Sequence, residues 1–224
     1  MIWLQQAAEN LSLSESTLDY LLGRGGSTAS IEAMGLGEWN PLPSDIPDKD
    51  FSYRYGKRGE KLEGYLTVPI RTVRGEPLGF EFRSMQEKHI FRFLSVPKSN
   101  WNPVWIMHPD SPQKIWNGGS VWIVEGVFDL LPMEWVVPPQ DAVLASIRAG
   151  LTRKHVAFLQ SVGAPMVHMV YDRDAAGRSA TQKALKILER AAIPSCRVSY
   201  VGGKDPGEIW DSAGKNGLLK AFKL

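Results

Sequence analysis

The stretch VYDRDAAGRSATQKAL, from Val170 to Leu185, places two aspartates one residue apart directly after an apolar run. That run, MVHMV at 166–170, has the composition of a buried strand, and the residues after the aspartates have that of a helix. Asp172 and Asp174 therefore lie in a turn between a strand and a helix. Taken alone, the pattern fits two structures: an acidic turn in which Asp174 caps the helix, or a loop that binds a divalent metal ion.

Similar strand-to-helix units fill the second half of the chain. Short apolar runs are separated there by segments with helical spacing. This alternation predicts a mostly parallel α/β sheet that is covered by helices on both faces. The expected strands are 121–124, 142–147, 166–170 and 195–201.

The first half of the chain has a different pattern. Two short helices are expected there, followed by a Pro/Asp-rich connector at 40–50 and by β-rich runs on either side of a hairpin turn at 74–77. We therefore predict a smaller mixed helical and antiparallel subdomain at 1–118, an α/β subdomain at 119–205 and a C-terminal helical tail at 206–224.

The composition is that of an ordinary globular protein, with 224 residues and a net charge of +2. The single cysteine, Cys196, excludes a disulfide framework and a cysteine-based zinc site. The N-terminus lacks the zones of a signal peptide and no apolar run could span a bilayer, so we expect a cytoplasmic protein with no membrane partner. Residues 51–100 carry ten basic and five acidic side chains. This excess suits a surface that binds a polyanion, although solvated faces produce similar blocks.

Acidic residues follow three of the predicted strands at the point where each strand ends. The carboxyl ends of parallel strands meet at one edge of a sheet, and α/β proteins bind ligands there. Crowded carboxylates repel one another unless a cation lies among them, and oxygen-only ligation favours Mg²⁺ or Mn²⁺ over zinc. The metal-binding loop therefore becomes the favoured interpretation. The residues at this edge are Glu125, Gly126 and Asp129 after the first strand, Asp172 and Asp174 after the third, and Lys204 and Asp205 after the fourth.

Three segments resemble the signature of the Toprim domain: VEGVFD at 124–129, YDRDAAGRSA at 171–180 and GKDPGE at 203–208. The second and third together resemble DnaG-type primases in particular. Two upstream segments, YLLGRGGSTASIEAMGLG at 20–37 and VPIRTVRGEPLGFEFR at 68–83, are similar to the opening of the primase RNA-polymerase core. The resemblance covers about residues 15–222. It implies a Toprim-type, mostly parallel sheet preceded by the smaller subdomain.

The sequence departs from the family pattern at two positions of the acidic edge. Arg173 stands where the family has glycine, and Gly207 stands where it has the second aspartate of a DPD motif. The zinc-ribbon and helical modules that flank the core in cellular primases have no counterpart in these 224 residues. We therefore expect a minimal catalytic core of phage or mobile-element origin.

The resemblance implies a DNA primase-like nucleotidyltransferase, which is a DNA-directed RNA polymerase that makes short RNA primers on single-stranded DNA. Its partners would be the single-stranded DNA template and ribonucleoside triphosphates, with a replicative helicase as a further candidate. Two or more Mg²⁺ (or Mn²⁺) ions, and no zinc, are the expected cofactors. The catalytic residues would be Glu125, Asp172 and Asp174; the same three with Asp129 and Asp205 would bind metal, and Lys204, Arg178 and Gly126 would bind nucleotide.

Template contacts are expected on the antiparallel sheet, at about residues 62–98. By the resemblance, Arg83 and Arg92 are the main phosphate contacts, and Arg71 and Lys98 are weaker ones. Ion pairs between these arginines and neighbouring glutamates such as Glu81 are the alternative. Two other functions stay open: a Toprim-type metal-dependent nuclease, and a catalytically weak DNA-binding replication adaptor.

Overall fold

A computed structural model describes most of the chain. The described residues are 8–9, 11–40, 64–72, 77–85, 90–94, 105–147 and 150–223. Lys98 lies outside these residues, so its role stays a prediction. Residues 74–76 of the predicted hairpin turn also lie outside them. Every helix in the described part of the chain is too short or too polar to cross a membrane.

The N-terminal part contains a four-stranded antiparallel sheet of order β1-β2-β3-β4. β2 and β3 form the predicted hairpin, with Val68 opposite Glu81. Each of the two preceding helices begins after a serine whose side-chain oxygen accepts a backbone hydrogen bond, Ser14 for α2 and Ser27 for α3. The bounds are α2 (Glu15–Gly23), α3 (Thr28–Met34), β1 (Gly37–Glu38), β2 (Leu66–Arg71), β3 (Pro77–Arg83) and β4 (Ile90–Leu94).

The second half contains a five-stranded sheet of order β5-β7-β6-β8-β9. β7, β6, β8 and β9 are parallel, and β5 pairs antiparallel with β7 at one edge. The predicted mostly parallel α/β sheet is therefore confirmed. The bounds are β5 (Ile106–Met107), α5 (Ser111–Trp116), β6 (Val121–Val124), α6 (Val127–Met133), β7 (Ala142–Ala145), α7 (Arg153–Ser161), β8 (Val167–Met169), α8 (Ala175–Arg190), β9 (Ser195–Arg197) and α9 (Pro206–Phe222).

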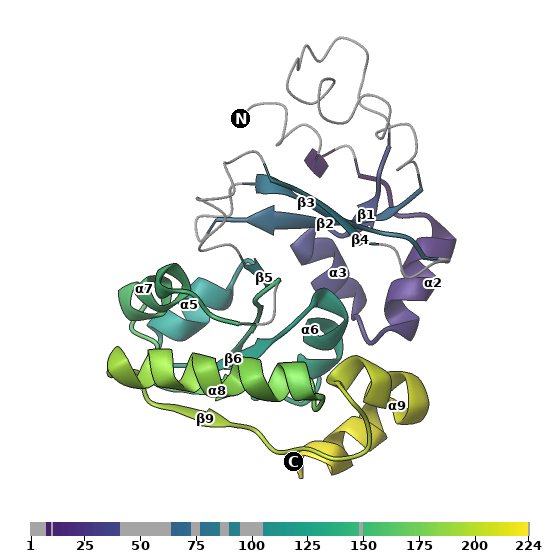
Figure 1. Cartoon of the computed structure of the whole chain (residues 1–224). Helices are drawn as coiled ribbons and strands as arrows, with labels where there is room; N and C mark the ends of the chain where they lie inside the picture. Colours follow the sequence, from purple (N-terminus) through teal and green to yellow (C-terminus); the bar gives the residue numbers. More distant parts are fainter. Residues whose placement is uncertain are drawn as a thin grey trace.

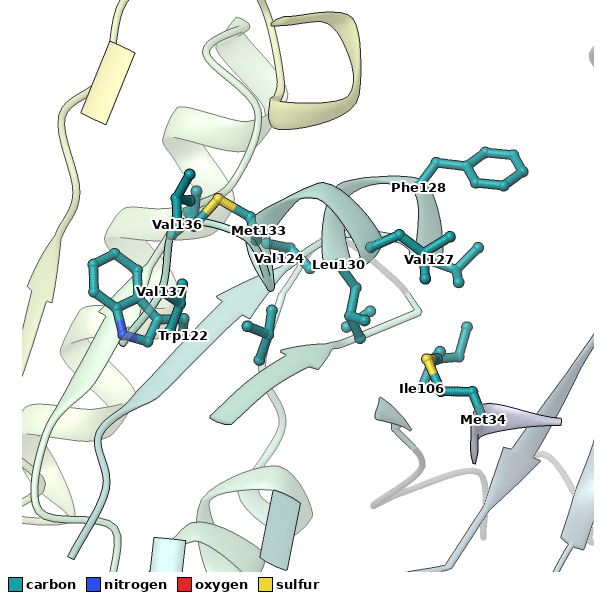
Figure 2. Close-up of a cluster of buried hydrophobic side chains, with 14 of the residues drawn as sticks. Met34, Ile106, Trp122, Val124, Val127, Phe128, Leu130, Met133, Val136 and Val137 are labelled. Atoms are coloured by element: carbon teal, nitrogen blue, oxygen red, sulfur yellow. The ribbon is translucent and has the colours of Figure 1, made fainter. Parts of the chain in front are cut away.

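Alternate residues of the central strand β6 face two separate apolar cores. Val121 and Ile123 pack with residues of α5, α7 and α8, whereas Trp122 and Val124 pack with residues of α6 and α9. Figure 2 shows part of the second core around α6, with Phe128 at its outer end. Because helices bury both faces of the sheet, the strand is apolar along its whole length.

The core around α6 also joins the two halves of the chain. It contains Leu21 of α2, Ile31 of α3 and Val68 of β2, so the N-terminal helices and sheet pack onto the second half (Figure 1). β5 and α5 pair or pack with β7 although they precede residue 119. The division into 1–118, 119–205 and 206–224 stays a prediction.

A cavity of about 260 Å³ lies at the carboxyl end of α6, lined by residues of α3, α5 and the segment after α6. Glu134 lines it and accepts a hydrogen bond from the Ser30 hydroxyl. Burial raises the pKa of Glu134, and Ser30, His108 and Lys114 offset this only in part. The ionised carboxylate therefore destabilises the fold at neutral pH.

Glu134→Gln is expected to stabilise the protein at about pH 7 and to have little effect at about pH 4. A carboxyl group with a raised pKa holds its proton more tightly in the folded state, so the wild type loses stability as the pH rises through that folded pKa. Glutamine keeps an oxygen that accepts from Ser30 and has no charge to desolvate. Urea denaturation of both proteins across this pH range measures the difference, with the exposed Glu189→Gln as control. A difference that does not grow with pH would contradict the prediction.

Candidate active site

Three loops at the carboxyl ends of β6, β8 and β9 meet at one edge of the second sheet, beside α6 and α9 (Figure 1). The parallel register aligns these strands, with Ile123 opposite Met169. The loops carry Glu125, Asp172 and Lys204, and the backbone N–H of Asp172 donates to Glu125 Oε1 at 3.4 Å. Residues that are far apart in the sequence therefore lie together at this edge.

Lys204 places a cation at this edge. Its Nζ lies 2.8 Å from Asp172 Oδ2 and 3.2 Å from Asp174 Oδ2, and these carboxylates raise the pKa of Lys204. Asp174 also caps α8, because its Oδ1 accepts the N–H of Gly177 at 2.8 Å. That hydrogen bond and Lys204 lower the pKa of Asp174. Asp174 therefore forms the helix cap that was one of the two alternatives, and its role as a metal ligand stays a prediction.

The pKa values of Glu125 and Asp172 are raised, with burial as the largest cause in each case. Asp172 adds to the shift of Glu125, and Asp205 and Asp174 add to that of Asp172 against the opposing effect of Lys204. The edge therefore carries more negative charge than Lys204 compensates. Carboxylate oxygens with such an excess suit a hard divalent cation.

The described residues do not present three or more acidic, histidine or cysteine side chains that already converge on one metal position. The space between the Asp172 and Asp174 carboxylates is taken by the Lys204 ammonium. The donor chemistry fits a divalent ion, but binding would require these side chains to rearrange.

Asp129 connects two of the loops from the first turn of α6. Its Oδ2 accepts the N–H of Gly126 at 3.2 Å, and its Oδ1 accepts the N–H of Gly207 at 3.3 Å. Burial, and then the charges of Asp205 and Asp172, raise the pKa of Asp129 to about 7. These bonds place Asp129 as a support of the cluster, and its role as a metal ligand stays a prediction.

Asp205 caps α9, and Gly207 follows in the first turn of that helix. Asp205 Oδ1 accepts the N–H of Glu208 at 2.7 Å. A Cβ at position 207 would lie 2.9 Å from the carbonyl oxygen of Phe128, which is closer than such atoms approach. The backbone of α6 therefore leaves no room for a side chain here, and this explains the glycine where the family pattern has aspartate.

The Arg173 side chain contacts the loop that carries Lys204. Its guanidinium donates to the Gly203 carbonyl at 3.0 Å and lies over the Tyr200 ring at 5.8 Å, and its backbone N–H donates to the Lys204 carbonyl at 2.8 Å. Arg173 therefore ties the Asp172 loop to the Lys204 loop. Arg178 donates to the carbonyl of Arg173, and its predicted contact with nucleotide is not tested by this arrangement.

Arg83 links the antiparallel sheet to the acidic edge. Its Nε donates to Glu81 Oε1 at 2.6 Å, its guanidinium lies 4.6 Å from the Phe128 ring centre, and a Cβ at Gly126 would lie 3.2 Å from its Nη2. The ion pair with Glu81 expected as the alternative therefore forms, at a point beside the carboxylates. Arg71 is half-buried, and burial lowers its pKa. The backbone of Arg92 pairs with Glu81, but its side chain is not described.

Sequence reasoning missed Arg24 and Phe128. The Arg24 guanidinium also lies 4.6 Å from the Phe128 ring centre. Arg24 forms an ion pair with Asp211 of α9 as well. Phe128 therefore contacts two arginines, a geometry that favours cation–π attraction. Nothing in the sequence around Arg24 or Phe128 predicts this contact. It forms because α2, β3 and α6 pack together.

Residues 122–210 match the Toprim-like family. This range begins in β6 and ends in α9, so it includes the whole acidic edge. This part of the chain is therefore similar to Toprim-like domains.

The predicted resemblance to DnaG-type primases is also confirmed. The chain is 25% identical over 225 residues to the DNA primase of Deinococcus radiodurans, across 92% of this chain and 39% of that protein. The crystal structure of the Aquifex aeolicus primase zinc-binding and RNA polymerase domains matches 98% of this chain and 59% of that one, with a TM-score of 0.70 and 22% identity. A DnaG primase catalytic domain bound to single-stranded DNA matches 96% of this chain and 73% of that one, with a TM-score of 0.67 and 19% identity.

The chain as a whole therefore has the fold of the DnaG primase catalytic core. It spans less than half the length of the curated primases to which it is similar.

Proposed function

We propose that the chain is the catalytic core of a primase that synthesises short RNA primers on single-stranded DNA. The observation that carries this proposal is that Glu125, Asp172 and Asp174 lie on neighbouring loops at one edge of a Toprim-like sheet, inside a fold shared with primase RNA polymerase domains. In the reaction, the 3′-oxygen of one ribonucleotide bonds to the α-phosphorus of the next, and the bond from that phosphorus to pyrophosphate breaks.

The acidic edge supplies the groups that this reaction needs. Glu125, Asp172 and Asp174 would hold Mg²⁺ or Mn²⁺, with Asp205 nearby and Asp129 fixing the loops. Divalent ions at such sites neutralise phosphate charge and favour the attacking oxygen. The chain's own contribution is to hold these carboxylates at one edge before substrate binds.

The template and nucleotide would lie on opposite sides of Arg83. The DNA backbone would follow the antiparallel sheet, where Arg83 is oriented by Glu81 and Phe128, and the triphosphate would lie over Lys204 and Gly126. Gly126 supports this because, among the described residues, only the Arg83 and Asp129 side chains lie within 4 Å of the position that a Cβ would take there. A replicative helicase partner and a cytoplasmic location are part of the same proposal.

Primer synthesis in vitro tests the proposal. The protein is incubated with single-stranded DNA, ribonucleoside triphosphates and Mg²⁺ or Mn²⁺, in parallel with Glu125→Gln, which keeps the shape of the side chain and removes its charge. Short RNA products that are absent with Glu125→Gln would support a primase. DNA fragments would instead indicate a nuclease, and DNA binding without either product would indicate an adaptor.

Arg83→Met is expected to weaken DNA binding and to reduce the slope of log affinity against log salt by about 1. Methionine retains an apolar stem over Phe128 but has no charge for a phosphate. The double variant Glu81→Gln/Arg83→Met is the matched control, because its net charge equals that of the wild type and it removes both members of the 2.6 Å pair. Fluorescence anisotropy across a salt series measures the slopes. If the double variant keeps the wild-type slope, Arg83 does not contact the template.

A further inference from the structure

The side chain of Lys204 occupies the position at the acidic edge where a metal ion would be needed. Its ammonium contacts one oxygen of Asp172 at 2.8 Å and one oxygen of Asp174 at 3.2 Å. Both are residues that the proposed function assigns to metal binding. The same two oxygens cannot be at bonding distance from an ammonium and a divalent ion at one point, because both cations require that space.

The backbone of Lys204 is held on both sides, whereas its side chain is half exposed. The N–H donates to the Glu208 carboxylate, and the carbonyl oxygen accepts from the Arg173 N–H at 2.8 Å and from the Tyr200 hydroxyl at 2.9 Å. The side chain is 50% exposed, and that of Asp174 is 42% exposed. The side chain can therefore leave the carboxylates without any movement of the loop that carries it.

We propose that Lys204 is an internal counter-ion that competes with the divalent metal for Asp172 and Asp174, and that metal binding releases its ammonium toward the nucleotide. This inference rests on the proposed function, since it takes the metal site as given. Without a divalent ion, Lys204 compensates part of the charge on the crowded carboxylates. With the ion bound, the released ammonium stays tethered at the rim of the site, where a triphosphate adds negative charge.

The competition is energetically accessible. The pair with Asp174 contributes little net free energy, because the Lys204 and Asp174 side chains are 50% and 42% exposed and stay hydrated when they separate. The Asp172 side chain is only 15% exposed, so its carboxylate exchanges the ammonium for the metal ion and not for water. A divalent ion that binds the same oxygens carries twice the charge of the ammonium, so the carboxylates attract it more strongly. Arg173 and Tyr200 keep the Lys204 backbone in place, so the exchange involves one flexible side chain.

Mn²⁺ binding to Lys204→Met tests this inference without reference to activity. Methionine has a similar length and leaves the backbone hydrogen bonds of residue 204 available. Titration of free Mn²⁺ by electron paramagnetic resonance is expected to show about fivefold tighter binding than in the wild type, equivalent to the roughly 1 kcal/mol of a half-exposed pair. Lys186→Met, an exposed lysine on α8, controls for the change in net charge and is expected to bind as the wild type does.

A second readout uses thermal unfolding of the same proteins. In EDTA, Lys204→Met is expected to melt below the wild type because the carboxylates lose their counter-ion. Saturating Mn²⁺ is expected to raise its melting temperature by more than that of the wild type. Lys204→Arg, which keeps the charge, serves as the alternative variant if the methionine variant does not fold, and it should not bind Mn²⁺ more tightly than the wild type.

The outcomes separate this inference from the proposed function. If Asp172→Ala abolishes Mn²⁺ binding but Lys204→Met and Lys186→Met both bind as the wild type does, the metal site stands and the competition is wrong. If Mn²⁺ affinity rises equally in Lys204→Met and Lys186→Met, the cause is the general change in charge, and the proposed competition is also wrong. If the wild type itself binds no Mn²⁺, both the inference and the metal site of the proposed function are wrong.

Discussion

Asp172→Ala is expected to lower primer synthesis by at least about 100-fold while the protein remains folded. The Asp172 carboxylate lies beside Glu125 and Asp174 and contacts Lys204 at 2.8 Å, so its loss removes the central acceptor of the acidic edge. Changing a group that only supports a metal ligand commonly costs 10- to 100-fold in affinity or activity, and loss of a ligand should cost at least the upper figure.

The fold should tolerate this change because the Asp172 carboxylate does not stabilise it at neutral pH. Burial raises its pKa even with Lys204 beside it, which means that the charged form is disfavoured in the folded protein. Circular dichroism and thermal unfolding check the fold, and primer synthesis with Mn²⁺ titration checks function. Glu189→Ala, an exposed carboxylate on α8, is the matched control. Synthesis at the wild-type rate by Asp172→Ala would refute the site assignment.

Gly177→Ala is expected to destabilise the protein by about 1–3 kcal/mol and to weaken metal binding, although every carboxylate is retained. A Cβ at position 177 would lie 2.2 Å from the carbonyl oxygen of Asp172 and 2.9 Å from its carbonyl carbon. These are backbone atoms of the acidic loop, so the clash is relieved only if that loop moves away from α8. The N–H of Gly177 also donates to Asp174, and the movement would disturb this cap.

Two effects of opposite sign act at this position. Alanine is the better helix former by about 1 kcal/mol, and Gly177 lies in the first turn of α8. A contact of 2.2 Å with backbone outweighs this gain, so the net effect should be a loss. Denaturant unfolding and Mn²⁺ titration measure the two expected effects, with the exposed Ser179→Ala in the next turn as control. Higher stability in Gly177→Ala would show that the close approach is not as described.

The sequence was sufficient to predict the parallel sheet because β6 and β8 lie between two apolar cores. β6 is apolar throughout and β8 is apolar on both sides of His168, and each strand is followed by a segment with helical periodicity. These patterns are local. The convergence of Glu125 and Asp172 was also predictable, since the carboxyl ends of neighbouring parallel strands meet at one edge. The TM-score of 0.70 to a primase structure agrees with that prediction of the fold.

The neighbours of each side chain at the edge were not predictable in this way. The sequence left Asp174 between a helix cap and a metal ligand; the structure shows the cap on Gly177 and adds a contact with Lys204, and the metal role stays a prediction. Arg173 stands between the two aspartates in the sequence, and the structure shows that its guanidinium donates to the Gly203 carbonyl. The contact of Phe128 with Arg24 and Arg83 joins three elements from distant parts of the chain.

The sequence by itself therefore determined the alternation of strands and helices from residue 121 onward and the carboxylates at the strand ends, because hydrophobic periodicity and strand polarity are properties of short segments. Only the tertiary structure decided that Lys204 lies between Asp172 and Asp174, that Asp129 bridges Gly126 and Gly207, and that position 207 has no room for a side chain. These features depend on distances of about 3 Å between separate loops, which follow from how α6, α8 and α9 pack around the sheet and not from any local pattern.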